Sequence, residues 1–178
     1  HRDSLSEYWL SDKPGTVHYD IIHNILVYYQ KVTFDFYQIK KEPYKQFKNL
    51  ISQDKETWVF TLNHDLFMEF MAKDFEIPIT FGDKHEISFR KDNKKNFDTI
   101  IPFSYSEKHE LKLDNNLFFK DKFGINLVKL HGGLSEFKYK DGSYLCNLTL
   151  NVKDSSELME NFKNMVDMRH YMPNGEVI

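Results

Sequence analysis

Two short apolar runs, each ended abruptly by polar or small residues, constrain the fold of this chain most strongly. Residues 58–62 (Trp-Val-Phe-Thr-Leu) form the first run, and residues 126–130 (Asn-Leu-Val-Lys-Leu) form the second. Short runs that are apolar on both sides of the pleat are typical of buried strands in parallel sheets. The sequence therefore predicts an α/β fold in which both runs are core strands of a parallel sheet.

The residues that follow these two strands are the candidates for a binding site. Asn63-His64-Asp65 follows the first strand, and His131-Gly132-Gly133 follows the second. In open α/β sheets, ligands bind in the crevice beyond the carboxyl ends of the strands. If the strands are parallel neighbours, Asn63 and His131 face the same crevice, and the two glycines let the backbone approach a ligand closely.

Apolar residues at helical spacing predict four helices around this sheet. They span approximately residues 17–40, 43–51, 65–74 and 155–168. We expect Glu42-Pro43 to interrupt the first helix, because an internal proline removes a hydrogen bond and clashes with the preceding turn. Pro43 instead suits the first turn of the second helix.

The remaining strand signals lie outside the predicted parallel sheet. Residues 86–91 and 99–103 predict strands of an excursion from the main fold, and residues 137–140 and 143–148 predict a hairpin around Asp141-Gly142. At the C-terminus we expect a turn at 172–175 and the start of a strand at 176–178. The predicted organisation has three parts, a helical segment at 1–56, core strands at 57–133 with an excursion at 79–123, and a hairpin and helix at 134–178.

Composition excludes several classes of protein. A single cysteine, Cys146, rules out a disulfide framework and a cysteine-based zinc site, and it favours a reducing cytoplasm. The net charge of −3 gives no basic field for nucleic acid, and the lysines of 91–95 fit a solvated loop. No apolar run of about 18 residues exists, so we expect no membrane span.

The residues at both strand ends resemble motifs of the Sir2-like domains. Residues 61–65 (Thr-Leu-Asn-His-Asp) are similar to the Thr-x-Asn-x-Asp motif, and Glu69 with the preceding Leu-Phe resembles the bacterial subgroup. Residues 129–132 (Lys-Leu-His-Gly) resemble that subgroup's second motif, whose next position is usually Ser and here is Gly133. The resemblance covers about residues 57–75 and 126–145, and it implies a Rossmann-like, Sir2-like fold.

The function implied by this resemblance is hydrolysis of NAD+ to nicotinamide and ADP-ribose in bacterial anti-phage defence. By analogy, Asn63 holds the ribose hydroxyls and the attacking water, and Asp65 lies beside the nicotinamide pocket. His131 is the general base or relays a proton from a ribose hydroxyl. NAD+ is then the substrate, and the chemistry needs no metal. The NAD-binding residues implied by the resemblance are Thr61, Asn63, Asp65, Gly132 and Gly133.

Other interpretations of these residues remain open. Asn63 or Asp65 could end the strand or cap the next helix, and His131 could be a core histidine before a turn. Asn63-His64 also resembles part of the binuclear phosphoesterase signature, but Gly82-Asp83 follows it in the wrong order. A zinc-dependent sirtuin deacylase needs four cysteines, whereas a zinc-free deacylase or a non-catalytic scaffold module stays possible. His64 occupies a variable position of the motif, so we expect it to be incidental.

The chain lacks the Gly-rich loop that Sir2-like domains carry on their first strand. Such a loop supplies backbone N–H donors to a diphosphate, and no Gly-x-Gly occurs here. We therefore expect an incomplete domain that by itself binds NAD+ weakly and turns it over poorly. Other domains of the chain or subunits of a defence complex, a homo-oligomer and a phage-derived trigger are the expected partners.

Overall fold

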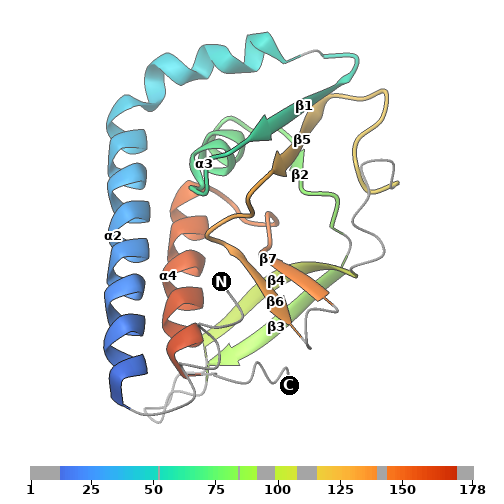
Figure 1. The fold of residues 1–178 in the computed structure, drawn as a ribbon. Coiled ribbons are helices and arrows are strands. Elements are labelled where there is room, and N and C mark those ends of the chain that lie inside the picture. The colour runs from blue at the N-terminus through green and yellow to red at the C-terminus, as the bar shows by residue number, and fades with distance from the viewer. Residues whose placement is uncertain are drawn as a thin grey trace.

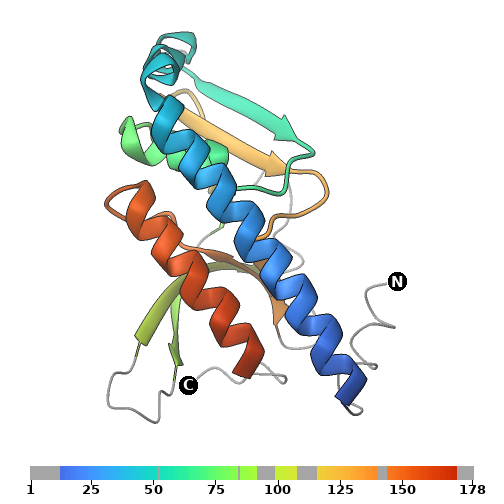
Figure 2. The same ribbon diagram turned by 90° about the vertical axis from the view of Figure 1, so that its left-hand side faces the viewer.

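The computed structural model describes residues 13–51, 53–83, 85–91, 99–107, 116–139 and 144–171. Two helices stand side by side along two small sheets (Figure 1, Figure 2). The elements in chain order are α2 (Lys13–Tyr44), the 3-10 helix η1 (Lys45–Leu50), β1 (Glu56–Thr61), α3 (Phe67–Asp74), β2 (Ile79–Thr80), β3 (His85–Lys91), β4 (Thr99–Glu107), β5 (Gly124–Lys129), β6 (Glu136–Tyr139), β7 (Tyr144–Leu148) and α4 (Ser155–Tyr171).

The first sheet contains the two predicted core strands as parallel neighbours. Its order is β1-β5-β2, and both pairings are parallel. The register aligns Glu56 with Gly124 and Thr61 with Lys129, so β1 and β5 end at the same level. The chain is therefore an α/β protein with a parallel three-stranded sheet, an arrangement compatible with a Rossmann-like fold.

The two strands of this pair differ in burial, and here one expectation was wrong. Ile125 and Leu127 of the central strand β5 are buried, as predicted for an apolar strand between two neighbours. In β1, however, Phe60 is 52% exposed, and Leu62 just beyond it is 60% exposed. The reason is position, because β1 lies at the edge of the described sheet and β5 at its centre.

The second sheet joins the predicted excursion to the predicted hairpin. Its order is β3-β4-β7-β6, and all three pairings are antiparallel. Strands β3 and β4 confirm the predicted strands at 86–91 and 99–103, and β6 and β7 confirm the two arms of the hairpin. Because β4 pairs with β7, the excursion and the segment 134–178 share one sheet instead of forming separate parts.

Helix α2 is longer at both ends than the sequence predicted. It includes Pro14 and Gly15 near its start, and it continues through Glu42-Pro43 to Tyr44. Pro43 is the penultimate residue, so its clash with the preceding turn affects only the helix end. The predicted helix of 43–51 is the 3-10 helix η1, with Ile51 buried after it but Leu50 79% exposed.

The main core lies where helices α2, α3 and α4 pack together and against β4 and β7. Phe70 of α3 contacts Phe34 of α2 edge-on, with 5.1 Å between the ring centroids, and Phe162 of α4 is fully buried in the same cluster. Aromatic side chains from elements far apart in sequence thus pack together in one core. No helix in the described part of the chain is long and apolar enough to cross a membrane.

A carboxylate at the end of α3 ties the three helices together. Asp74 accepts hydrogen bonds from the hydroxyl of Tyr37 (3.1 Å) and from the backbone N–H of Ser155 (2.9 Å). Lys41 lies 3.4 Å from the same carboxylate. We call Asp74, Tyr37, Lys41 and Ser155 the Asp74 junction. Because its members come from α2, α3 and α4, it fixes the C-terminal end of α3.

Some predicted features fall outside the described residues. They are the lysines of 92–95, the turn at Asp141-Gly142, and the turn and strand start of 172–178. Cys146 is described, as a buried free thiol of β7. Burial raises the pKa of Cys146 to about 11, so it is a neutral thiol at physiological pH.

Candidate active site at the ends of β1 and β5

The two motif segments leave the sheet next to each other. Thr61 and Lys129 are register partners at the ends of β1 and β5, and the N–H of Leu130 donates to the carbonyl of Thr61 at 2.9 Å. Asn63 and His131 each lie two residues beyond this pair. The candidate residues therefore begin from one edge of the sheet, because the strands are parallel and end in register.

His64 links the two segments directly. Its Nδ1 lies 2.7 Å from the carbonyl oxygen of Gly132, and its own carbonyl accepts the N–H of Leu134 at 2.9 Å. Since a carbonyl oxygen can only accept, Nδ1 carries the proton in this contact. His64 was expected to be incidental to the site, but within the chain its contacts cross from the first motif to the second.

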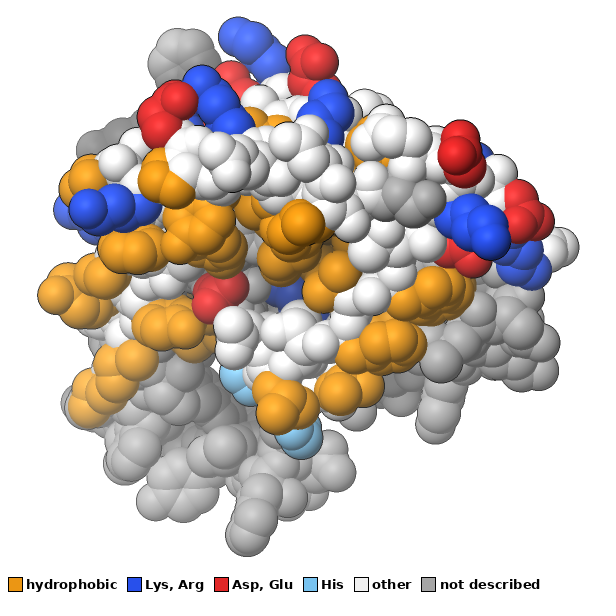
Figure 3. Space-filling view, turned by 90° about the horizontal axis from the view of Figure 1, so that it is seen from above, with side chains coloured by type: hydrophobic (Ala, Val, Ile, Leu, Met, Phe, Trp, Pro, Cys, Tyr) orange, Lys and Arg blue, Asp and Glu red, His pale blue; other side chains and the backbone are white. Residues whose placement is uncertain are grey.

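Asn63 and His131 are both exposed. The ring of His131 lies 6.3 Å from the ring of His64, between centroids, so the two imidazoles face the same region. Figure 3 shows the pale-blue histidines beside a recess, in which acidic and basic side chains lie between hydrophobic ones. These exposures leave Asn63 and His131 accessible to a solute.

Thr61 has a local role in the structure. Its hydroxyl oxygen accepts the backbone N–H of Asn63 at 3.0 Å, which turns the chain as it leaves β1. This contact sets the direction of the segment that carries Asn63. Thr61 therefore shapes the turn after β1, whereas its role in NAD binding stays a prediction.

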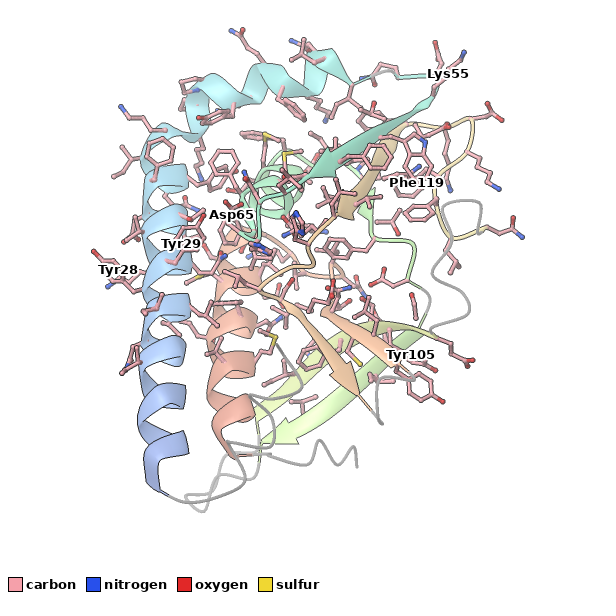
Figure 4. All side chains as sticks on the ribbon, in the orientation of Figure 1. Tyr28, Tyr29, Lys55, Asp65, Tyr105 and Phe119 are labelled. Atoms are coloured by element: carbon pink, nitrogen blue, oxygen red, sulfur yellow. The ribbon has the colours of Figure 1, made fainter. Side chains whose placement is uncertain are left out.

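Asp65 lies two residues before α3, whose N-cap residue is Leu66, and its carboxylate bonds across the turn into the helix. One carboxylate oxygen accepts the N–H of Phe67 at 3.0 Å, and the other accepts the hydroxyl of Tyr29 at 3.4 Å. Figure 4 shows Tyr29 of α2 directed toward Asp65. Burial and the adjacent Asp65 carboxylate raise the pKa of Tyr29. Asp65 thus orders the turn that leads into α3 and contacts α2 through Tyr29.

Backbone conformation and close packing explain why glycine occupies positions 132 and 133. Gly132 has a φ of +76°, which side chains rarely adopt. A Cβ at Gly133 would lie 3.0 Å from Cδ of Lys129, closer than most Cβ contacts. Gly133 therefore lets its loop lie directly on the Lys129 side chain.

A buried ion pair under the two segments was not foreseen from the sequence. Nζ of Lys129, the last residue of β5, lies 2.6 Å from Oε1 of Glu69, in the first turn of α3. The side chains are 6% and 0% exposed. The signal was present, because a lysine in an apolar core strand needs a buried partner and Glu69 is the acidic residue in the first turn of the adjoining helix.

No metal site is evident in the part of the chain that the structure describes, where no three His, Cys, Asp or Glu residues are grouped to hold an ion. Asp83, which the phosphoesterase alternative would use, instead accepts the hydroxyl of Ser104. Burial raises the pKa of Asp83, while that hydrogen bond opposes the shift. Its contact is with β4, in the second sheet.

Comparisons of the chain with protein-family models, with curated proteins and with solved structures find no significant match. The likeness to Sir2-like domains consequently stands on the two motifs and on the parallel pairing of the strands that carry them.

Proposed function

We propose that the protein hydrolyses NAD+ to nicotinamide and ADP-ribose at the ends of β1 and β5. The observation that carries this proposal is the register of the parallel pair, which puts the Asn63 and His131 segments side by side. In this proposal the fold is Sir2-like and the enzyme is an effector of bacterial anti-phage defence. A phage-derived signal and partner subunits control it.

The reaction breaks the bond between C1′ of the ribose and N1 of nicotinamide. The bonding electrons pass to N1, which neutralises the pyridinium, and C1′ becomes oxocarbenium-like as in other glycosyl transfers. Water adds to C1′ and releases one proton. The site therefore needs a group that orients water and ribose, and a base that accepts that proton.

Asn63 and His131 provide these two functions in the proposed mechanism. The neutral amide of Asn63 hydrogen-bonds the ribose hydroxyls and the water without trapping a cation. The imidazole of His131 accepts the proton that the attacking water releases, and such general-base help is worth roughly 10²–10⁴ in rate. Both side chains are exposed in the absence of substrate, which leaves them accessible to it.

The test is release of nicotinamide from NAD+ by the purified full-length protein, with and without phage lysate as the trigger. We expect Asn63→Ala and His131→Ala to abolish release. Asn49→Ala changes an exposed asparagine of η1 that belongs to neither motif, and it should leave the rate unchanged. Undiminished release by both motif variants would overturn the proposal.

A second candidate is a non-catalytic interaction module, which the outer face of α2 favours. Seven large apolar side chains of this helix are between 47% and 76% exposed, and exposed apolar patches often mark interaction sites. They are Ile21, Ile25, Tyr28, Tyr29, Val32, Phe36 and Ile39. Under this alternative, Asn63→Ala and His131→Ala leave defence intact, whereas charged substitutions on α2 abolish it.

A further inference from the structure

The ion pair between Lys129 and Glu69 lies directly behind both motif segments. Lys129 precedes His131 by two residues, and Glu69 is in the first turn of the helix that follows Asn63 and Asp65. The two side chains meet at 2.6 Å and are almost completely buried. This one ion pair therefore connects the strand that precedes the His131 segment to the helix that follows the Asn63 segment.

The ammonium of Lys129 has a second contact in the same place. It donates to the backbone carbonyl of Asp65, at the turn between β1 and α3. The stem of Lys129 in turn supports the loop of Gly133, where a Cβ would lie 3.0 Å from Cδ. Lys129 thus contacts the first segment through Asp65, its helix through Glu69, and its own segment through Gly133.

A gain in folding stability does not by itself explain a buried ion pair of this kind. Removing two charges from water costs free energy that their attraction only partly recovers, and apolar replacements of similar size are often as stable. Oε2 of Glu69 has no hydrogen-bond partner, which leaves the pair short of full compensation. Burial raises the pKa of Glu69 against the opposing effect of Lys129, as expected for a costly charge.

We infer that Lys129 and Glu69 are positioning residues, which hold the Asn63–Asp65 segment and the His131–Gly133 segment in the relative placement that cleavage requires. Misplacing reacting groups by about 1 Å can cost roughly 10² in rate, so a rigid buried link is valuable there. This inference rests on the proposed NAD+ hydrolysis for its kinetic part. Its structural part, the link between the segments, does not depend on it.

The test uses the full-length protein with the double substitution Glu69→Leu and Lys129→Met, which replaces both charged side chains with apolar ones of similar size. We expect a midpoint of unfolding near that of the wild type, a kcat lower by about 10²-fold and a nearly unchanged KM. Hydrogen exchange should accelerate at the amides of Leu130 and Leu134, which donate from the second segment to the first. Lys73→Met is the matched control, because Lys73 of α3 donates only to the Leu150 carbonyl among the described contacts, and it should leave kcat unchanged.

The outcomes separate the two proposals. A folded double variant with wild-type kcat and wild-type exchange overturns the positioning role and leaves NAD+ hydrolysis intact. If the wild type cleaves no NAD+ while the double variant exchanges faster only at Leu130 and Leu134, the link stands and the proposed function fails. Should the double variant not fold, Glu69→Leu alone decides, because it removes the carboxylate that Lys129 contacts while Lys129 can still donate to the Asp65 carbonyl. Unchanged exchange and kcat in that variant also overturn the inference.

Discussion

The two ends of the short helix α3 carry carboxylates in opposite situations. Asp74 at its C-terminal end accepts hydrogen bonds from Tyr37, Lys41 and Ser155, and its side chain is 11% exposed. Glu69 at its N-terminal end is fully buried, meets Lys129, and has one oxygen without a partner. Both carboxylates join elements distant in sequence, but only the Asp74 junction is fully satisfied.

The pKa values of the two carboxyls move in opposite directions. Burial acts to raise the pKa of Asp74, but the bonds from Ser155 and Tyr37 and the charge of Lys41 outweigh it, so the pKa is lowered. For Glu69 burial prevails and the pKa is raised. The folded state therefore favours the charged form of Asp74 and disfavours that of Glu69. The comparison indicates that the Asp74 junction serves stability, whereas the Lys129–Glu69 pair serves placement.

The largest effect is expected when the buried pair is broken on one side. Lys129→Met alone leaves the Glu69 carboxylate buried without a cation, and we expect a loss of about 3–5 kcal/mol in the free energy of unfolding. Adding Glu69→Leu should recover most of that loss, because both members of the pair are then apolar. Urea denaturation measures both values, and equal stability of the single and double variants would contradict this description of the pair.

A smaller loss is expected at the other end of the helix. Asp74→Asn replaces one accepting oxygen with an amide that cannot accept, so a donor from Tyr37 or Ser155 loses its partner. Hydrogen bonds to a charged group are worth about 1.5–3 kcal/mol, and we expect a loss in that range. The rate of NAD+ cleavage at a temperature where the variant is folded should not change. A large fall in that rate would erase the distinction between the two ends.

The pH dependence of that loss sharpens the comparison. Because the pKa of Asp74 is lowered on folding, its charge stabilises the protein above the ordinary value of 3.8, and the contribution disappears as pH falls through the folded value. The stability difference between wild type and Asp74→Asn should thus be constant near neutral pH and shrink below about pH 4. Denaturation at several pH values measures it, and a difference that grows in acid would refute the assignment. The raised pKa of Glu69 has the opposite sign, since its contribution decreases as pH rises.

The smallest effect is expected from His64. His64→Ala removes the contact with the Gly132 carbonyl at 2.7 Å, and a neutral hydrogen bond contributes about 0.5–1.5 kcal/mol. We expect a loss of this size, with faster hydrogen exchange at Leu134. Unaltered exchange at Leu134 would mean that His64 is incidental to the loop.

The parallel strands could be predicted because their pattern is local. Two apolar runs with polar ends identify β1 and β5, and their common direction follows from the α/β pattern between them. Strand and helix types were also correct for the hairpin and for α4. The pattern of apolar and polar residues shows that a segment is a strand, but not which strands lie beside it. It therefore could not reveal that β1 lies at the edge of the described sheet.

The contacts that distinguish the two ends of α3 could not be predicted in the same way. Asp74 reaches Ser155, 81 residues away, and Lys129 reaches the Asp65 carbonyl, 64 residues away. The pairing of β4 with β7 is equally remote in sequence. Such contacts depend on how whole elements pack, for which a single sequence contains no periodic signal. The continuation of α2 through Pro43 is a local error, because Pro43 stands in the last turn, where the lost hydrogen bond affects only the end of the helix.

The central claim is that NAD+ binds where β1 and β5 end. Titrating the isotopically labelled full-length protein with NAD+ and following backbone amide shifts by NMR tests this claim most directly, since binding is detected whether or not a trigger is present. We predict that the shifts concentrate in residues 61–66 and 130–134. Shifts confined to the second sheet or to α2, or no shifts at millimolar NAD+, would contradict it.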